Sequence, residues 1–277
     1  MRLRWLIGLA VAATALIVAG GALGVGPWPG LAPSVAATDG SMLYSAKSVE
    51  LGAKTRVTAR RVGDLRAARS ILVKGGFGIP AVTVTGAPGG LSADGRTLVL
   101  AQFPSLSVLP ITRSLFLVLS TAPLQLRHTI TLRGDFGFDA LSPDGRTLFL
   151  IQRRSSVDAR YSVRAFDLRT LRLLPDTIVD KTEPDGTMRG FPVARAQSAG
   201  GTWVYTLYRR VGAEPFVHAL NTRGRYAVCV DLVWRGKADD LWATSLELTS
   251  DGRQVLVRSP RGETVARIDT RTLQLVK

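Results

Sequence analysis

The side chains best suited to chemistry lie in three short, irregular segments, 133–140, 183–192 and 236–243. An apolar lining with a few convergent polar groups is how small-molecule sites are commonly built. The candidate ligand-binding residues are Asp135, Phe136, Asp139, Arg189, Asp239, Asp240 and Trp242. If folding brings these segments together, the residues form one binding surface. The alternative is that the aromatic side chains fill the core and the carboxylates pair with the many arginines.

Residues typical of catalytic or metal sites are scarce. His128, His218 and the single cysteine Cys229 all lie in apolar stretches typical of strands. The sequence contains no HExxH, paired CxxC, EF-hand loop or GxSxG motif. We therefore expect structural imidazoles, a buried inert thiol, no catalytic set, no metal site and no cofactor. The acidic segment 180–185 has oxygen ligands for a hard cation, although a solvated loop is the simpler expectation.

The first 36 residues have the features of a targeting segment. Arg2 and Arg4 precede an apolar run at 5–26, and prolines end it. A helix of this length spans a bilayer, so an uncut chain would contact the membrane through the run. Its densest part also fits a signal peptide, with small residues for cleavage before Ala37. We expect residues 1–36 to be a signal peptide or N-terminal membrane anchor with a linker, and 37–277 to be an exported domain.

The net charge of the chain limits the classes of partner that it is expected to bind. Without residues 1–36 the chain keeps 34 basic residues against 21 acidic ones, a net charge of +13. Such a charge attracts polyanions electrostatically, and salt reduces the range of this attraction. For an exported protein we expect no nucleic acid as partner, and instead phospholipid headgroups or an anionic envelope polymer. A merely solubilising basic surface is the alternative.

One turn recurs along the chain at intervals of 50 to 56 residues. It occurs at Asp39-Gly40, Asp94-Gly95, Asp144-Gly145, Gly200-Gly201 and Asp251-Gly252. A short apolar strand follows each turn, and in 147–151 both alternating sets of side chains are apolar. Such a strand is covered on both faces. Because aspartate and glycine have sufficient structural roles in turns, we assign this motif no chemistry.

A unit of about 50 residues with four strands has the size of a β-propeller blade. The sequence predicts an all-β fold, a propeller of about five or more four-stranded blades preceded by an N-terminal hydrophobic helix. Ring closure would protect strand edges from pairing with other chains. In such blades the Asp-Gly turns occupy one rim and the irregular segments the other. The competing architecture is a β-sandwich, which does not demand this period.

The repeats resemble a known group. LSADGRTLVLAQ (91–102), LSPDGRTLFLIQ (141–152) and VARIDTRTLQLV (265–276) are similar to repeats of exported bacterial β-propellers of the YVTN, lactonase-like, TolB-like and WD40-like groups. The similarity covers nearly all of 39–277. It implies the fold and leaves the activity open. The chain lacks the Tyr-Val-Thr-Asn tetrad and is too short for seven blades.

These features favour a monomeric binding module at the cell envelope over an enzyme. Its expected partner is a protein, a peptide or an anionic envelope polymer, recognised by the irregular loops that a rigid frame carries. The alternative is a lactonase-like or other metal-assisted hydrolase. In that case Asp135, Asp139, Asp239 or Asp240 would hold a divalent metal or act as general base. A sensory or structural role without a ligand is also open.

Overall fold

The structure is a computed structural model that describes residues 29–64, 67–102, 110–154, 159–180 and 187–276. The expected N-terminal helix and most of the acidic segment 180–185 lie outside these ranges. Among the described residues, no helix combines the length and the apolar character that a membrane span needs.

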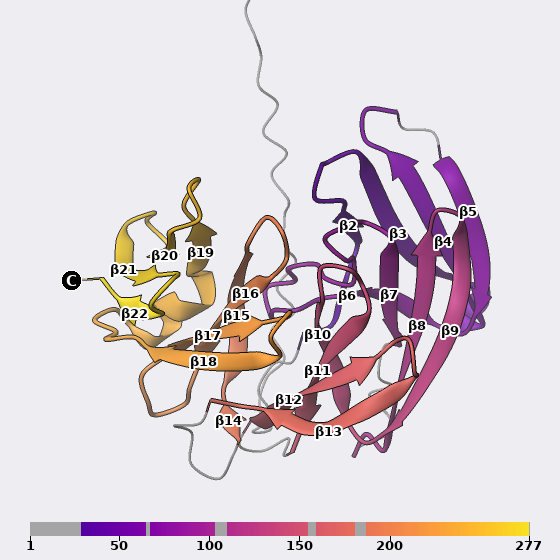
Figure 1. Cartoon of the computed structure of the whole chain (residues 1–277). Helices are drawn as coiled ribbons and strands as arrows, with labels where there is room; N and C mark the ends of the chain where they lie inside the picture. Colours follow the sequence, from indigo (N-terminus) through magenta and orange to yellow (C-terminus); the bar gives the residue numbers. More distant parts are fainter. Residues whose placement is uncertain (1–28, 65–66, 103–109, 155–158, 181–186, 277) are drawn as a thin grey trace, which may run out of the picture.

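Five antiparallel sheets follow one another along the chain (Figure 1). Sheet 1 contains β2 (Ser34–Ala36), β3 (Met42–Val49), β4 (Lys54–Arg61) and β5 (Ala67–Lys74). Sheet 2 contains β1 (Leu31–Ala32), β6 (Phe77–Pro80), β7 (Thr97–Gln102), β8 (Arg113–Thr121) and β9 (Leu124–Arg133). Sheet 3 contains β10 (Phe136–Leu141), β11 (Thr147–Arg153), β12 (Arg160–Asp167), β13 (Arg172–Ile178) and the short β14 (Met188–Arg189).

The last two sheets have four strands each. Sheet 4 contains β15 (Phe191–Gln197), β16 (Trp203–Arg209), β17 (Phe216–Asn221) and β18 (Tyr226–Asp231). Sheet 5 contains β19 (Ser245–Leu248), β20 (Gln254–Arg258), β21 (Thr264–Asp269) and β22 (Gln274–Leu275). Two short 3-10 helices are η1 (Glu50–Gly52) and η3 (Ala238–Ala243). The predicted all-β fold of successive blades is confirmed.

The recurring turn has the structural role that its residues predict. In sheet 3, Asp144 Oδ1 accepts hydrogen bonds from Ser142 Oγ at 2.7 Å and from the Arg146 amide at 3.1 Å. Gly145 has φ of 64°, a conformation that a residue with a side chain rarely adopts. The same contacts hold the turns at Asp94 and Asp251. These carboxylates therefore stabilise the turns that connect two neighbouring strands of a sheet.

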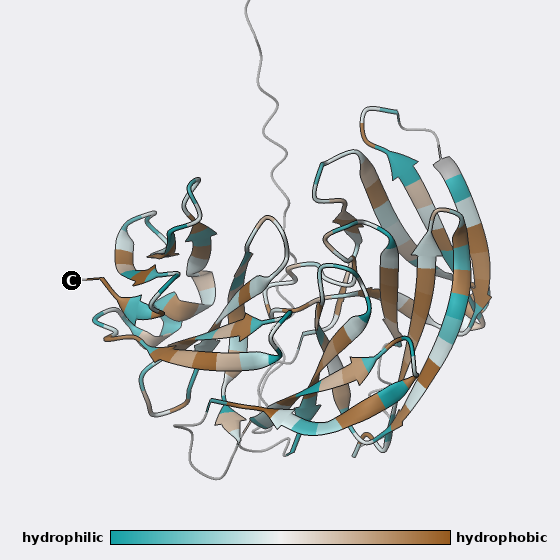
Figure 2. Cartoon of the chain, in the orientation of Figure 1, coloured by the Kyte–Doolittle hydropathy of each residue, from teal (hydrophilic) through white to brown (hydrophobic). Residues whose placement is uncertain are grey.

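The apolar residues of the middle sheets pack on both faces, as the sequence predicted. Leu148 and Leu150 pack with Phe116 of sheet 2, whereas Phe149 packs with Tyr208 of sheet 4 on the opposite face of β11. Four apolar clusters of this kind each join two consecutive sheets. Hydrophobic residues occupy much of the strands in the middle of the arc (Figure 2).

The five sheets form an arc rather than the expected closed ring. Sheets 1 and 5 lie at its two ends (Figure 1), and no apolar cluster of the described residues joins them. A closed ring would place the outer face of sheet 1 against the outer face of sheet 5. Sheet 1 exposes Lys47 and Arg56 on its outer face, and sheet 5 exposes Glu247 and Arg267. Burial of unpaired cations such as Lys47 and Arg56 would cost several kcal/mol each.

The first strands begin earlier than the sequence indicated. Residues 31–36, assigned above to the leader and linker, form β1 and β2. In β1 Leu31 pairs with Pro80, in β2 Val35 pairs with Tyr44, and Val35 is buried in the cluster between sheets 1 and 2. β2 is the inner strand that precedes the first Asp-Gly turn, as in the other sheets.

This placement predicts the effect of shortening the chain. A chain that begins at Ala37 lacks β1 and β2, whereas one that begins at Pro29 keeps both. The loss of the buried Val35 side chain and of the strand hydrogen bonds is expected to lower the free energy of unfolding by about 3 kcal/mol. Urea denaturation of both chains measures the difference. Equal midpoints and slopes would show that β1 and β2 contribute nothing to stability.

Candidate functional site

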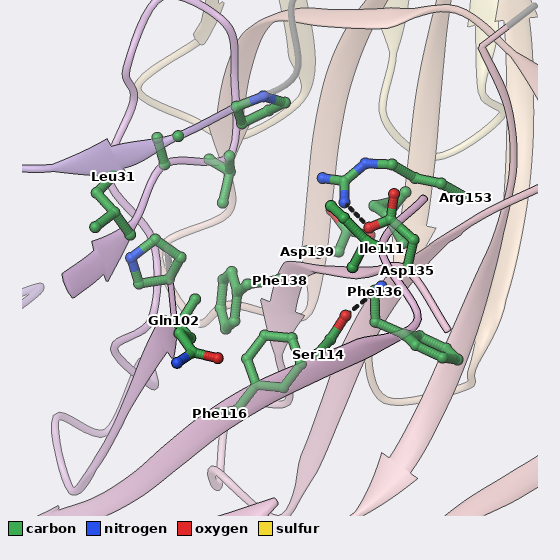
Figure 3. Close-up of a pocket in the computed structure, with 18 of the residues that line it drawn as sticks. Leu31, Gln102, Ile111, Ser114, Phe116, Asp135, Phe136, Phe138, Asp139 and Arg153 are labelled. Atoms are coloured by element: carbon green, nitrogen blue, oxygen red, sulfur yellow. Dashed lines mark hydrogen bonds and ion pairs between the residues drawn. The ribbon is translucent and has the colours of Figure 1, made fainter. Parts of the chain in front are cut away.

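A small pocket lies between sheets 2 and 3, next to the segment 133–140 that the sequence singled out (Figure 3). This central pocket has a volume of about 80 Å³. Its walls combine apolar side chains with a few polar groups. They include Leu31, Gln102, Ile111, Ser114, Phe116, Asp135, Phe136, Phe138, Asp139 and Arg153. The volume admits a few waters or one protruding chemical group, and it is well below the roughly 300–1,000 Å³ typical of small-molecule sites.

An ion pair lies at one side of the central pocket. Arg153 Nη1 donates to Asp135 Oδ1 at 2.5 Å, and the backbone amide of Arg153 donates to the Asp135 carbonyl at 3.0 Å. Gly137 makes this position possible, because a Cβ there would lie 2.7 Å from Arg153 Nη2. The Arg153 and Asp135 side chains are only 12% and 25% exposed. The pair therefore orders the wall of the pocket and offsets its charge.

A second ion pair crosses from sheet 3 to sheet 4. Asp139 is the extra residue of a β-bulge in β10 and is 2% exposed. Its Oδ1 and its carbonyl oxygen both accept hydrogen bonds from the Arg195 guanidinium, whose Nε donates to Thr206 Oγ1 at 3.1 Å. Asp139 Oδ2 has no hydrogen-bond partner among the described residues. The carboxylate is held in place by this clamp and has one oxygen left for a further donor.

Behind this pair lies a buried aromatic cluster. The rings of Tyr161 and Phe216 both stack on Tyr208, with centroids 4.9 and 5.2 Å away. Burial raises the pKa of Tyr161 and of Tyr208 well above the usual value. Burial also lowers the pKa of His218 to about 4, although Asp139 opposes the change. His218 is therefore a neutral core imidazole near pH 7.

The thiol lies next to this imidazole. Cys229 Sγ is 3.8 Å from His218 Nδ1, and its backbone amide donates to Asp180 Oδ2 at 2.5 Å. The expected full burial of Cys229 is not observed, because the residue is half-buried on the outer strand of sheet 4. Within the described part of the chain, no three histidine, cysteine, aspartate or glutamate side chains are grouped to hold a metal ion.

The structure separates the predicted site residues. Asp135, Phe136 and Asp139 line the central pocket. Arg189 is exposed on β14, and its strand partner is Arg160. The remaining three belong to η3, where Asp239 is exposed, Asp240 Oδ2 accepts from the Lys237 amide at 3.2 Å, and Trp242 lies 4.9 Å beneath the Arg209 guanidinium.

Sequence reasoning missed several residues of the site. Arg153 and Arg195 lie in strands, and strand positions gave no reason to select two arginines out of many. Tyr161 lies in β12, the third strand of sheet 3, and Tyr208 lies in β16, the second strand of sheet 4. The composition of these strands gave no signal, because only the packing of sheet 3 on sheet 4 brings the two rings together.

Comparisons with known proteins agree with this architecture. No family model matches the chain, and no relative was found among the curated proteins. The β-propeller domain of Cps50 (Swd1) from Myceliophteria thermophila is 14% identical, with 84% of this chain and 62% of that chain covered and a TM-score of 0.49. TolB from Acinetobacter baumannii is 12% identical, with 87% and 55% covered and a TM-score of 0.47. A puromycin hydrolase mutant complexed with PGG is 15% identical, with 88% and 36% covered and a TM-score of 0.51.

These similarities concern the fold. The chain spans less than two thirds of the length of each of the three structures. At such identities the activities of those proteins do not carry over to this chain. The five successive antiparallel sheets, together with the similarity to the puromycin hydrolase structure at a TM-score of 0.51, confirm the predicted fold: the chain has a β-propeller fold.

The buried ion pair generates a prediction about stability. Arg195→Met leaves the Asp139 carboxylate buried without a compensating charge, so we expect a loss of about 3–5 kcal/mol in the free energy of unfolding. The double variant Asp139→Leu/Arg195→Met should recover most of it. Arg253→Met is the matched control, because it removes an exposed ion pair with Asp251 and should cost below about 1 kcal/mol. Chemical denaturation gives the values, and equal losses for the two single variants would contradict a structural role for the clamp.

The buried imidazole generates a prediction about pH. Unfolded His218 takes up a proton near pH 6.5, whereas the folded protein keeps it neutral down to about pH 4. Its contribution to stability is therefore complete above pH 6.5 and is lost as the pH falls toward 4. Between pH 7.5 and 5.5 we expect a loss of about 1.4 kcal/mol. Denaturation at both pH values measures this loss.

Two variants isolate the His218 contribution. His218→Phe should lose this part of the pH dependence, whereas His128→Gln, which changes an exposed side chain, should keep the wild-type slope. A wild-type slope in His218→Phe would show that other groups cause the effect.

Proposed function

We propose that the chain is a binding module of the cell envelope, exported or membrane-tethered, which recognises a protein or peptide at the central pocket. The observation that carries this proposal is the size of the pocket. At about 80 Å³ it holds one side chain of a larger partner better than it holds a whole small molecule. The envelope location rests on Arg2, Arg4 and the apolar run at 5–26.

The walls of the pocket define the group that would enter. Phe116, Phe136 and Phe138 supply apolar walls, so an aliphatic or aromatic side chain fits them. Gln102 at the margin is exposed and offers an amide to a partner's backbone. Because Arg153 already pairs with Asp135, a charged partner side chain gains little there.

Blocking the pocket tests the proposal. Leu31 is 36% exposed and Ile111 is half-buried, and both line the pocket, so Leu31→Trp and Ile111→Trp should fill it without emptying the core. Each full-length variant serves as bait in envelope extracts, and bound proteins are quantified by mass spectrometry. We expect the recovery of a specific partner to fall about tenfold, equivalent to about 1.4 kcal/mol.

Val211→Trp is the control for this experiment. Val211 is 77% exposed in a loop of sheet 4 and does not line the pocket. This variant should recover the same partner as the wild type. If both blocking variants retain every partner while remaining folded, the central pocket is not the recognition site.

A further inference from the structure

The outer face of sheet 1 is strongly basic, and none of the described sheets covers it. Alternation along β4 buries Thr55, Val57 and Ala59 against sheet 2 and turns Arg56 and Arg60 outward. The strand register adds residues of β3 and β5 to the same side of the sheet. We define the basic face as Lys47, Arg56, Arg60 and Lys74, with Ser45, Thr58, Ser70 and Leu72 between them.

Positive side chains lie opposite one another on neighbouring strands of this face. Lys47 pairs with Arg56 across β3 and β4, and Lys54 pairs with Lys74 across β4 and β5. Like charges in directly opposite positions destabilise a sheet. Lys54 forms an ion pair with Glu50 at 3.0 Å. β3, β4 and β5 contain no aspartate or glutamate, and the four cations of the basic face make no ion pair with any described residue.

The rest of the basic face can accept polar and apolar groups. Ser45, Thr58 and Ser70 form one row across the three strands, in which Ser70 is exposed, Ser45 is half-buried and Thr58 is buried. Leu72, in the row of Lys47 and Arg56, is 52% exposed. Neighbouring strands lie about 4.8 Å apart, so a sheet presents its side chains as a broad and nearly level surface.

We propose that the basic face docks on the surface of an anionic lipid bilayer. Clusters of lysine and arginine are attracted to anionic lipid headgroups, and the effect disappears beyond a Debye length. Cations spread over three strands match a plane of headgroups, the Ser70 hydroxyl can donate to a phosphate oxygen, and Leu72 reaches toward the acyl boundary. This surface is separate from the central pocket and adds membrane docking to the binding function.

The connection to the apolar run would keep the domain near a bilayer. β1 of sheet 2 begins at Leu31, five residues after position 26, and β2 of sheet 1 begins at Ser34, eight residues after it. Eight residues span at most about 27 Å. If the run is held in a bilayer, the inner strands of sheets 1 and 2 therefore both stay within this distance of it, and docking of the basic face becomes intramolecular.

Vesicle flotation with the full chain tests the proposal. The measured quantity is the ratio of binding to phosphatidylcholine vesicles with 30% phosphatidylglycerol over binding to pure phosphatidylcholine vesicles. This ratio cancels insertion of the apolar run, which both vesicles allow. The test variant is Lys47→Gln/Arg56→Gln/Lys74→Gln. Each cation contributes a factor of about five to binding, so we expect the test variant to lower the ratio about 100-fold. High salt should lower the ratio of the wild type in the same way.

Two comparisons keep the result interpretable. Arg172→Gln/Arg223→Gln/Arg261→Gln removes three exposed charges from sheets 3, 4 and 5 and should change the ratio by less than threefold. The test variant loses like-charge pairs, so its thermal midpoint should equal or exceed that of the wild type. Equal losses in both triple variants, or equal wild-type binding to both vesicles, would overturn the proposal. The proposal would also be overturned if the basic face bound soluble dextran sulfate more tightly than anionic vesicles at equal charge concentration. That result would identify a polymer as the partner of this face.

Discussion

The structure depends on strands that are apolar on both faces. Leu148 and Phe149 are neighbours in β11 and point to opposite sides, and both are fully buried. Neither side can be left in water, because each large apolar side chain is worth about 2 kcal/mol when buried. A sheet on each side satisfies both faces, so the sheets stack sideways into an arc. The repeat of about 50 residues in the sequence is the consequence of this demand.

The same constraint explains where the stacking stops. Sheets 1 and 5 are apolar only toward their inner neighbours. Their other faces bear exposed charges such as Arg56 and Arg267, which favour water or an oppositely charged surface over another sheet. A charged end face ends the arc, and on sheet 1 it is also the surface that we propose for the membrane.

Polar groups inside the arc are few and tightly held. Asp139 and Arg195 join sheets 3 and 4 through two hydrogen bonds, and Arg153 with Asp135 orders the pocket wall. Because these groups are fixed by rigid strands, the central pocket is shaped before a partner arrives. Preorganisation of this kind reduces the entropy that binding must overcome.

The sequence by itself determined the fold class, the blade-sized repeat and the role of the Asp-Gly turns, because these depend on local alternation and on backbone preferences at glycine. It also selected Asp135, Phe136 and Asp139, which the structure places in the wall of the central pocket. Only the tertiary structure decided that Arg189, Asp239, Asp240 and Trp242 lie outside this pocket, that Arg153 lines it, that Arg195 holds Asp139, and that β1 and β2 lie within residues 31–36. These outcomes depend on which sheets become neighbours and on how a bulge turns one side chain, and residues distant in the sequence settle both.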